Sequence, residues 1–105
     1  ITPRAGGSGR TGGALPAQGG LVLATERLNR ILDLDEREGT VLVEPGVLLA
    51  DLHGAVEEKG WFYPPDPNSA DLCRLAGNVA ENAAGPRAFK YGPTGNYVLG
   101  LDAYL

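Results

Sequence analysis

The sequence predicts an α+β fold, in which helices pack on a small mixed sheet beside a glycine-rich loop. Three observations support this class. Two segments with alternating apolar residues are joined by a short link, as in a β-hairpin. A later segment places its apolar residues at helical spacing. Glycine makes up 16 of the 105 residues, about twice its ordinary share, while charged and aromatic fractions are normal.

The first part of the chain predicts a loop, a strand and a hairpin. Residues 3–20, PRAGGSGRTGGALPAQGG, show no periodicity and contain two prolines, so we expect an ordered loop. The apolar residues 20–25 predict a short buried strand. Residues 31–35 and 40–44 alternate around the link EREG and predict a hairpin. The side chains expected on its shared apolar face are Leu32, Leu34, Val41 and Val43.

The second part predicts two helices among extended segments. Apolar side chains at helical spacing predict an amphipathic helix over 47–59, and they are Leu48, Leu52, Ala55 and Val56. WFYPP is strand-like and leads into a proline-interrupted loop. LAGNVAENAAG predicts a short helix that contains Gly77, where glycine marks a close approach. Residues 97–105, YVLGLDAYL, are strand-like. Both ends of the chain look truncated, so we expect residues 1–105 to be part of a single domain.

Composition excludes several function classes. A net charge of -4 and a pI near 4.8 lack the positive field that nucleic acid or anionic lipid requires, so neither is an expected partner. The single cysteine, Cys73, forms no internal disulfide, and the lone His53 builds no metal site by itself. We see no signal peptide and no apolar run long enough to span a membrane. We therefore expect a soluble, cytoplasmic protein.

The N-terminal glycines indicate an anion-binding loop. Residues 7–12, GSGRTG, match the GxGxxG pattern, but Pro16, Gly19 and Gly20 interrupt the helix that a Rossmann motif would open. A P-loop is excluded because no Lys-Ser/Thr pair follows. Consecutive small residues can still expose several backbone N–H groups toward one anion, and a diphosphate suits such a loop. The alternative is a flexible linker or a surface loop that tolerates glycine.

A family resemblance supports the anion-binding interpretation. Six short segments occur in one order along nearly the whole chain, and they are PRAGGSGRTGGA, VEPG, PPDPNS, GNVAEN, KYG and VLGL. Together they resemble the FAD-binding domain of the vanillyl-alcohol oxidase and para-cresol methylhydroxylase (PCMH-type) superfamily. Within it, the sequence is most similar to the flavoprotein subunit of glycolate oxidase and to FAD-linked D-lactate dehydrogenases.

The resemblance implies two groups of residues that bind FAD. The first loop would wrap the diphosphate with backbone donors, through Arg4, Ala5, Gly6, Gly7, Ser8, Gly9, Gly13 and Ala14. The later segments would line the rest of the cofactor, through Pro65, Asp66, Ser69, Gly77, Asn78, Asn82, Gly85, Tyr91 and Gly92. Asn78 and Asn82 are four residues apart and would share a helical face, although a capping or turn role is an equal alternative for either one.

The sequence departs from the family pattern at five positions. Ala5, Ala76 and Ala84 stand where glycine is usual, and Ser8 stands where threonine is usual. Arg74 replaces a small hydroxyl residue, so its cation would either pair with a phosphate or point to solvent.

Other side chains with chemical potential have simpler interpretations. Some relatives attach the flavin covalently to a histidine in the first loop, where this chain has Ser8, so non-covalent FAD is expected. Cys73 is expected to be a small buried hydrophobic residue. His53 is expected to lie on the surface of the helix or half-buried.

The implied activity is oxidation of a small D-2-hydroxy acid of the glycolate or D-lactate type by hydride transfer to FAD. In the relatives the substrate is bound mainly by another domain, so no catalytic residue and no metal ligand is assigned here, and this chain alone is expected to be inactive. Partner subunits are compatible with this interpretation. Two alternatives stay open: a flavoenzyme similar to the reductase of UDP-N-acetylenolpyruvylglucosamine, and a non-catalytic accessory subunit with the same fold.

Overall fold

The computed structural model describes residues 1–67, 72–86 and 88–103, and within them it confirms an α+β fold. The strands are β1 (Thr2–Arg4), β2 (Val22–Ala24), β3 (Ile31–Asp35) and β4 (Thr40–Val43). The helices are α1 (Leu49–Glu58), α2 (Leu75–Ala80), α3 (Ala88–Tyr91) and a 3-10 helix, η1 (Thr94–Tyr97). The described strands form two separate pairs: β1 and β2 are parallel, and β3 and β4 are antiparallel.

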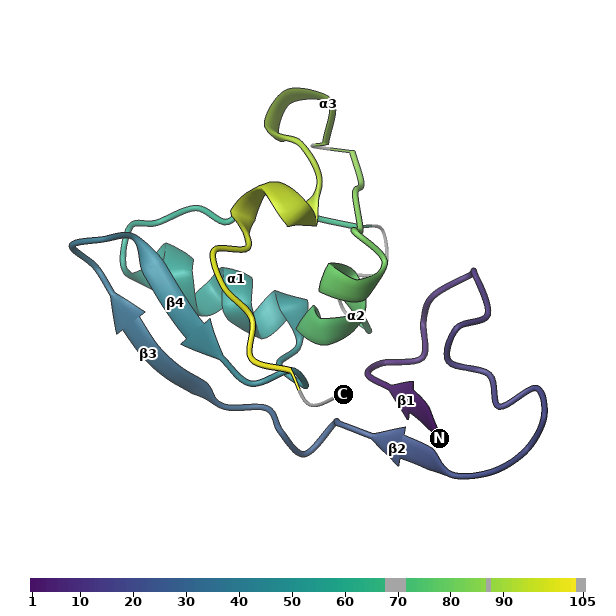
Figure 1. Ribbon diagram of the computed structural model, residues 1–105. Helices are drawn as coiled ribbons and strands as arrows, with labels where there is room; N and C mark the ends of the chain where they lie inside the picture. The colour runs from purple at the N-terminus through teal and green to yellow at the C-terminus, as the bar shows by residue number, and fades with distance from the viewer. Residues whose placement is uncertain (68–71, 87, 104–105) are drawn as a thin grey trace.

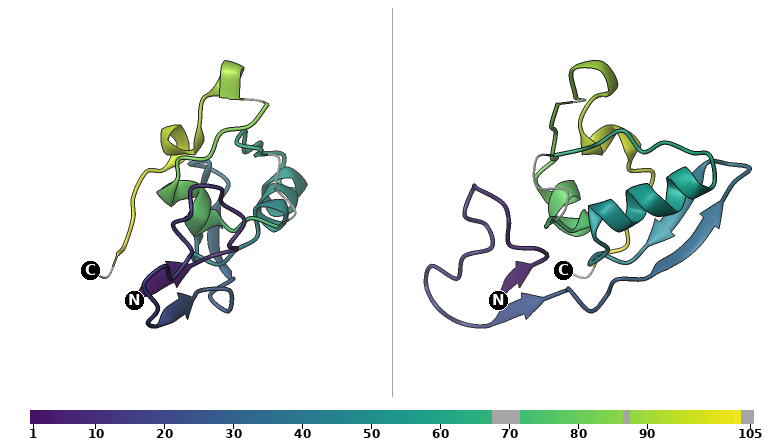
Figure 2. Two further views of the ribbon diagram at one scale, coloured as in Figure 1. Left: turned by 90° about the vertical axis from the view of Figure 1, so that its right-hand side faces the viewer. Right: turned by 180° about the vertical axis from the view of Figure 1, so that it is seen from behind.

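The apolar core lies between α1 and the β3–β4 hairpin, which α1 crosses on one face (Figures 1 and 2). The buried side chains of this core are Val47, Leu49, Leu52, Val56 and Cys73. Partly buried side chains from the hairpin and the later chain pack against them, namely Ile31, Leu34, Val41, Val43, Tyr63 and Leu75. Burial of this apolar surface is the main stabilising contribution that the described residues make.

The hairpin is confirmed, but its expected apolar face is wrong at one position. The strand register shifts between Ile31 and Asp33, so that Ile31 pairs with Val43 while Asp33 pairs with Leu42. A bulge of this kind breaks the two-residue alternation of side chains. Ile31 therefore faces the core and Leu32 is 49% exposed.

The amphipathic helix is confirmed, but it begins later than the predicted residue 47. Leu48 has an extended conformation and pairs in an antiparallel bridge with Arg74, just before α2. Two backbone hydrogen bonds flank this bridge: Leu75 N–H donates to the Val47 carbonyl at 2.8 Å, and Leu49 N–H donates to the Cys73 carbonyl at 3.1 Å. The backbone before α1 is therefore hydrogen-bonded to the backbone at the start of α2.

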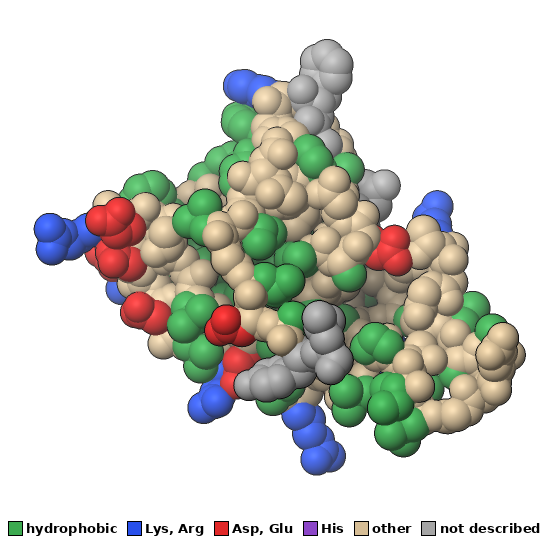
Figure 3. All heavy atoms as spheres, in the orientation of Figure 1, with side chains coloured by type: hydrophobic (Ala, Val, Ile, Leu, Met, Phe, Trp, Pro, Cys, Tyr) green, Lys and Arg blue, Asp and Glu red, His purple; other side chains and the backbone are tan. Residues whose placement is uncertain are grey.

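Three predicted strands differ from the structure. β2 is shorter than predicted and is not buried, with Leu21 62% and Leu23 54% exposed, because only the short β1 pairs with it. Hydrophobic side chains accordingly gather on the surface at this end of the molecule (Figure 3). WFYPP is irregular rather than a strand. Residues 98–103 are also irregular and exposed, because they join no ladder among the described strands.

No helix among the described residues is long and apolar enough to cross a membrane.

Candidate functional site

A cleft of about 310 Å³ separates the N-terminal glycine loop from α2. The loop stands beside α2 in Figure 1 and in the right-hand view of Figure 2, and the space-filling surface is hollowed between them (Figure 3). Ten of the predicted cofactor residues line this cleft: Arg4, Ala5, Gly6, Gly7, Ser8, Gly9, Gly13, Ala14, Gly77 and Asn78. The structure thus brings the first group of predicted residues together with two members of the second group.

The loop docks on the segment before α2 by a close approach at Gly6, where a side chain has no room. A Cβ built on Gly6 would lie 2.7 Å from the Leu72 carbonyl oxygen. One built on Gly77 would lie 3.7 Å from the Ala5 methyl, which is ordinary van der Waals contact. The methyl of Ala5, at a position where glycine is usual, therefore fits against the bare surface of Gly77.

Several hydrogen-bond donors in this cleft have no partner. Within the described residues, the backbone N–H groups of Gly6, Gly7 and Gly9 donate no hydrogen bond. The Asn78 side chain is buried, and its Nδ2 has no partner among the described residues; the same holds for Nε of Arg4. A buried donor without a partner is unfavourable, so Nδ2 of Asn78 and Nε of Arg4 fit a ligand that is rich in acceptor oxygens. The three glycines are exposed, so their N–H groups are open to solvent or to such a ligand.

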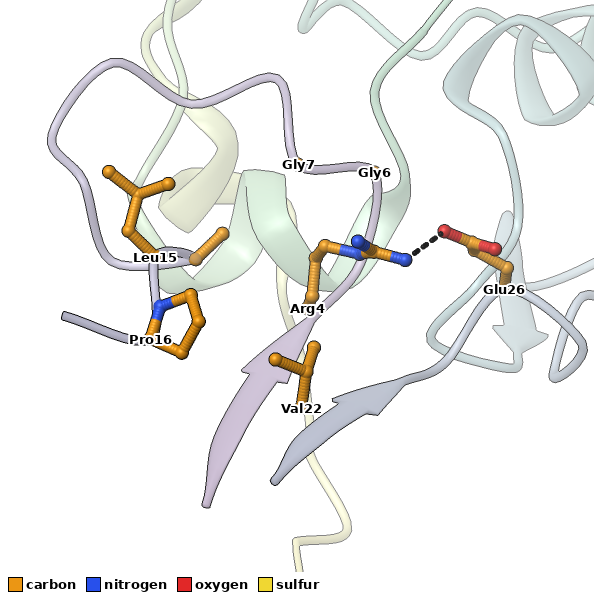
Figure 4. A pocket seen from close by; sticks show the side chains of 8 residues that line it. Arg4, Gly6, Gly7, Leu15, Pro16, Val22 and Glu26 are labelled. Carbon is orange, nitrogen blue, oxygen red and sulfur yellow. Dashed lines mark hydrogen bonds and ion pairs between the residues drawn. The ribbon is translucent and has the colours of Figure 1, made fainter. Parts of the chain in front are cut away.

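Arg4 lies where the loop begins, and its side chain extends to Glu26, two residues after the end of β2. Its Nη2 lies 3.2 Å from the Oε1 atom of Glu26, and both side chains are about half-exposed (Figure 4). A second, shallower cavity of about 520 Å³ lies at this ion pair and is lined also by Leu15, Pro16 and Val22. The two cavities share Arg4, Gly6, Gly7 and Ala14, so the same stretch of loop borders both.

Arg74 binds backbone carbonyls of the chain through Nη1, and its pairing with a phosphate stays a prediction. Its Nη1 donates to the Gly46 carbonyl at 2.6 Å and more weakly to the Glu26 carbonyl at 3.4 Å. Gly46 is itself buried, and a Cβ there would lie 2.6 Å from the Leu28 carbonyl oxygen. Arg74 therefore holds together two turns and the start of α2, while it also lines the cleft.

Sequence reasoning missed Thr11 and Glu81, which both line the cleft. The hydroxyl of Thr11 donates a hydrogen bond of 2.6 Å to Oε1 of Glu81, although 70 positions separate them in the sequence. Glu81 is four residues after Gly77, and this helical spacing could have indicated that Glu81 lies on the side of α2 that faces the cleft.

Six other predicted residues do not line the cleft, and a seventh lies outside the described residues. The six are Pro65, Asp66, Asn82, Gly85, Tyr91 and Gly92. The seventh is Ser69. Gly85 packs instead against Asp66, whose carbonyl a Cβ at position 85 would strike. The buried Pro65 accepts a hydrogen bond of 2.8 Å from the half-buried His53, consistent with its predicted place on the helix. Cofactor contacts by these seven residues stay predictions.

The expectation that Asn78 and Asn82 share a helical face is wrong, because α2 ends at Ala80. Asn82 has a left-handed conformation with φ of 50°, and its Oδ1 accepts a hydrogen bond of 2.8 Å from Gly95 N–H. It therefore has the turn role that the sequence left open. Tyr91 and Gly92 also lie near η1, since the Tyr91 carbonyl accepts a hydrogen bond of 2.6 Å from the Tyr97 hydroxyl.

Two further side chains bear on the chemistry of the chain. Cys73 is buried and free, as expected for a small hydrophobic residue. Tyr63 packs at the core, and its ring lies edge-on to Tyr97 with centroids 5.8 Å apart. Burial, with a smaller contribution from Tyr97, raises the pKa of Tyr63 to about 12, against the opposing effect of a hydrogen bond with Thr94. The phenol therefore stays neutral at physiological pH.

Similarity to known proteins identifies the family. A family model described as FAD binding domain matches residues 1–105. The chain belongs to this family. FAD is therefore the cofactor, and the resemblance to a PCMH-type FAD-binding domain is confirmed. The chain is 48% identical to "Glycolate oxidase subunit GlcD" of Bacillus subtilis (strain 168), over 100% of this chain and 22% of that protein.

Other relatives carry related names. The chain is 42% identical to a "D-2-hydroxyglutarate dehydrogenase" of Xanthomonas citri pv. viticola, over 96% of this chain and 21% of that protein. It is 40% identical to a "D-lactate dehydrogenase" of Anaerostipes hadrus, over 100% of this chain and 22% of that protein. A solved alkyldihydroxyacetonephosphate synthase, 29% identical, superposes with a TM-score of 0.77, over 90% of this chain and 19% of that one. This chain thus spans about a fifth of the length of these relatives.

The residues of the cleft fit the diphosphate of FAD. The free N–H groups of the loop and the unpartnered Nδ2 of Asn78 are donors, and a diphosphate offers only acceptors. The absence of a side chain at Gly6 lets the loop approach the Leu72 carbonyl, and its absence at Gly77 leaves room for the Ala5 methyl beside the cleft.

Proposed function

We propose that this chain binds the diphosphate of FAD between its glycine loop and α2. The chain would do so within an enzyme that oxidises a small D-2-hydroxy acid. The observation that carries the proposal is the shared cleft, in which loop donors and a buried, unpartnered Asn78 amide face one space. FAD, when bound, supplies the redox chemistry by accepting a hydride. The names of the relatives support glycolate or D-lactate as the class of substrate.

The residues of this chain act by binding and positioning. Gly6, Gly7 and Gly9 offer backbone N–H groups, and charge-assisted hydrogen bonds of this kind contribute about 1.5–3 kcal/mol each. Arg4 adds a cation at the start of the loop, and its salt bridge with Glu26 fixes the direction of the guanidinium. Asn78 donates from the opposite wall. We assign no catalytic residue to this chain.

The rest of the proposal concerns the protein that contains this chain. Because relatives are named as subunits of glycolate oxidase, we propose that the protein works with partner subunits. Non-covalent attachment of FAD is supported by Ser8, which stands in the loop where a histidine would make the bond. The cytoplasmic location, the single-domain boundaries and a substrate site in another domain stay predictions.

The visible spectrum of the purified full-length protein tests the proposal. We expect the absorbance of oxidised flavin, and we expect anaerobic D-lactate or glycolate to bleach it, with L-lactate as the control. Bleaching by NADPH but not by hydroxy acids would favour the reductase instead. A correctly folded, colourless protein that takes up no added FAD would refute cofactor binding and leave the accessory subunit. Flavin that remains in the protein pellet after acid precipitation would refute non-covalent attachment.

A further inference from the structure

A side-chain hydrogen bond joins the glycine loop, residues 5–20, to the far wall of the cleft. Within the described residues, the backbone hydrogen bonds of residues 5–20 stay inside the loop. Among residues 1–67, 72–86 and 88–103, the bond of 2.6 Å from the Thr11 hydroxyl to the Glu81 carboxylate is the one side-chain hydrogen bond that the loop makes with another part of the chain. This contact joins the tip of the loop to the end of α2, on the opposite wall of the cleft.

The helix fixes the position of the carboxylate. Glu81 directly follows α2, and its backbone N–H donates to the Gly77 carbonyl at 3.0 Å, which anchors the residue to the helix. On the loop side, a Cβ at Gly13 would lie 3.4 Å from Oε1 of Glu81. The carboxylate therefore lies against both Thr11 and Gly13, and a larger residue at position 13 would press on it.

A carboxylate beside a diphosphate site needs a physical reason, because like charges repel. The hydroxyl of Thr11 supplies one, since a donor to Oε1 directs the carboxylate toward the loop. We propose that Thr11 and Glu81 are positioning residues that set the width of the cofactor cleft without touching FAD. This inference rests on the proposed function, because it takes FAD as the occupant of the cleft.

The test combines variants in the full-length protein with two measurements. The disrupting variants are Thr11→Val, Glu81→Ala and the double variant, and the conservative ones are Thr11→Ser and Glu81→Gln. We expect each disrupting single variant to release FAD about five-fold faster than wild type, as the loss of one exposed hydrogen bond implies. The double variant should release FAD no faster than either single variant, because both substitutions remove the same hydrogen bond. The conservative variants should stay close to wild type, because each keeps a donor or an acceptor.

The second measurement needs no cofactor. Arg10 is exposed and directly precedes Thr11, so trypsin cleavage after Arg10 reports how firmly the loop is held. In FAD-free protein we expect faster cleavage in the disrupting variants. Glu57→Ala, which removes an exposed carboxylate from α1, is the control for both measurements and should match wild type.

The outcomes separate this inference from the proposed function. Three results would overturn the positioning role. They are additive effects of the two substitutions on the rate of FAD release, tighter FAD binding in Glu81→Ala, and equally fast FAD release in Glu81→Gln and Glu81→Ala. If wild-type protein binds no FAD, the proposed function fails and the inference about the cofactor cleft fails with it. If wild-type protein binds FAD but the FAD-free disrupting variants are cleaved after Arg10 no faster than FAD-free wild type, the inference alone is overturned.

Discussion

The substitution Gly6→Ala tests most directly how the cleft is built. The new Cβ would lie 2.7 Å from the Leu72 carbonyl oxygen, whereas carbon and oxygen atoms in contact lie about 3.3 Å apart or more. The loop and the segment before α2 must therefore separate by about 0.6 Å. Both sides are backbone, so no change of rotamer relieves the contact. Overpacking of this kind costs about 1–3 kcal/mol, which corresponds to FAD affinity weakened by about five-fold to 150-fold.

Titration of FAD into cofactor-free, full-length protein measures this effect, with calorimetry or flavin fluorescence as the signal. Gly100→Ala is the matched control, because a Cβ at Gly100 meets no atom within 4 Å and the residue lies outside the cleft. We expect the control to bind as wild type does. If Gly6→Ala also binds FAD with wild-type affinity, the docking of the loop on the Leu72 carbonyl does not shape the site.

Three further predictions concern stability and are measured by urea or pH denaturation. Gly54→Ala should raise the free energy of unfolding by about 0.5–1 kcal/mol, because Gly54 lies exposed inside α1 and an added methyl would have no atom within 4 Å; an unchanged unfolding midpoint would contradict this. Arg74→Ala should lower the free energy of unfolding by about 1–3 kcal/mol, because the carbonyl of the buried Gly46 loses its hydrogen bond of 2.6 Å. Arg74→Lys should recover only part of this loss. Wild-type stability in the alanine variant would show that the bond contributes nothing. The pKa of Tyr63 is raised to about 12 in the folded chain, so its contribution to stability is complete below pH 10 and is lost as the pH rises from about 10 to 12. The Tyr63→Phe variant should lose less stability than wild type over that interval, and equal losses would exclude Tyr63 as the cause.

Much of the fold could be predicted because its signals are local. The alternation in residues 31–44 and the helical spacing of Leu52 and Val56 reflect burial against each other, and both elements form where expected. The bulge after Ile31 could not be predicted, since one irregular residue leaves almost no trace in composition. Residues 20–25 and 97–105 read as strands from their apolar residues alone, but strand formation and burial depend on partners.

The candidate site was predictable where it depends on glycine. The close approach at Gly6 follows from the absence of a side chain, which is visible in the sequence, whereas a Cβ at Gly77 would make only ordinary contact. The contacts of Arg74 and Glu81 were not predictable, because long side chains choose partners that only the fold brings near. Arg74 illustrates this point, because the sequence does not indicate that its Nη1 binds the carbonyls of Gly46 and Glu26.

The apolar core forms from the later part of the chain. In the described residues, every member of the core and every side chain packed against it comes from Ile31 or later. The part of the chain that leaves the ribosome first is thus the part with the least apolar anchoring of its own. A ligand that binds only the ordered form stabilises that form by mass action. We therefore expect flavin capture to complete the folding of the N-terminal residues, and flavin-starved cells to expose them to proteases.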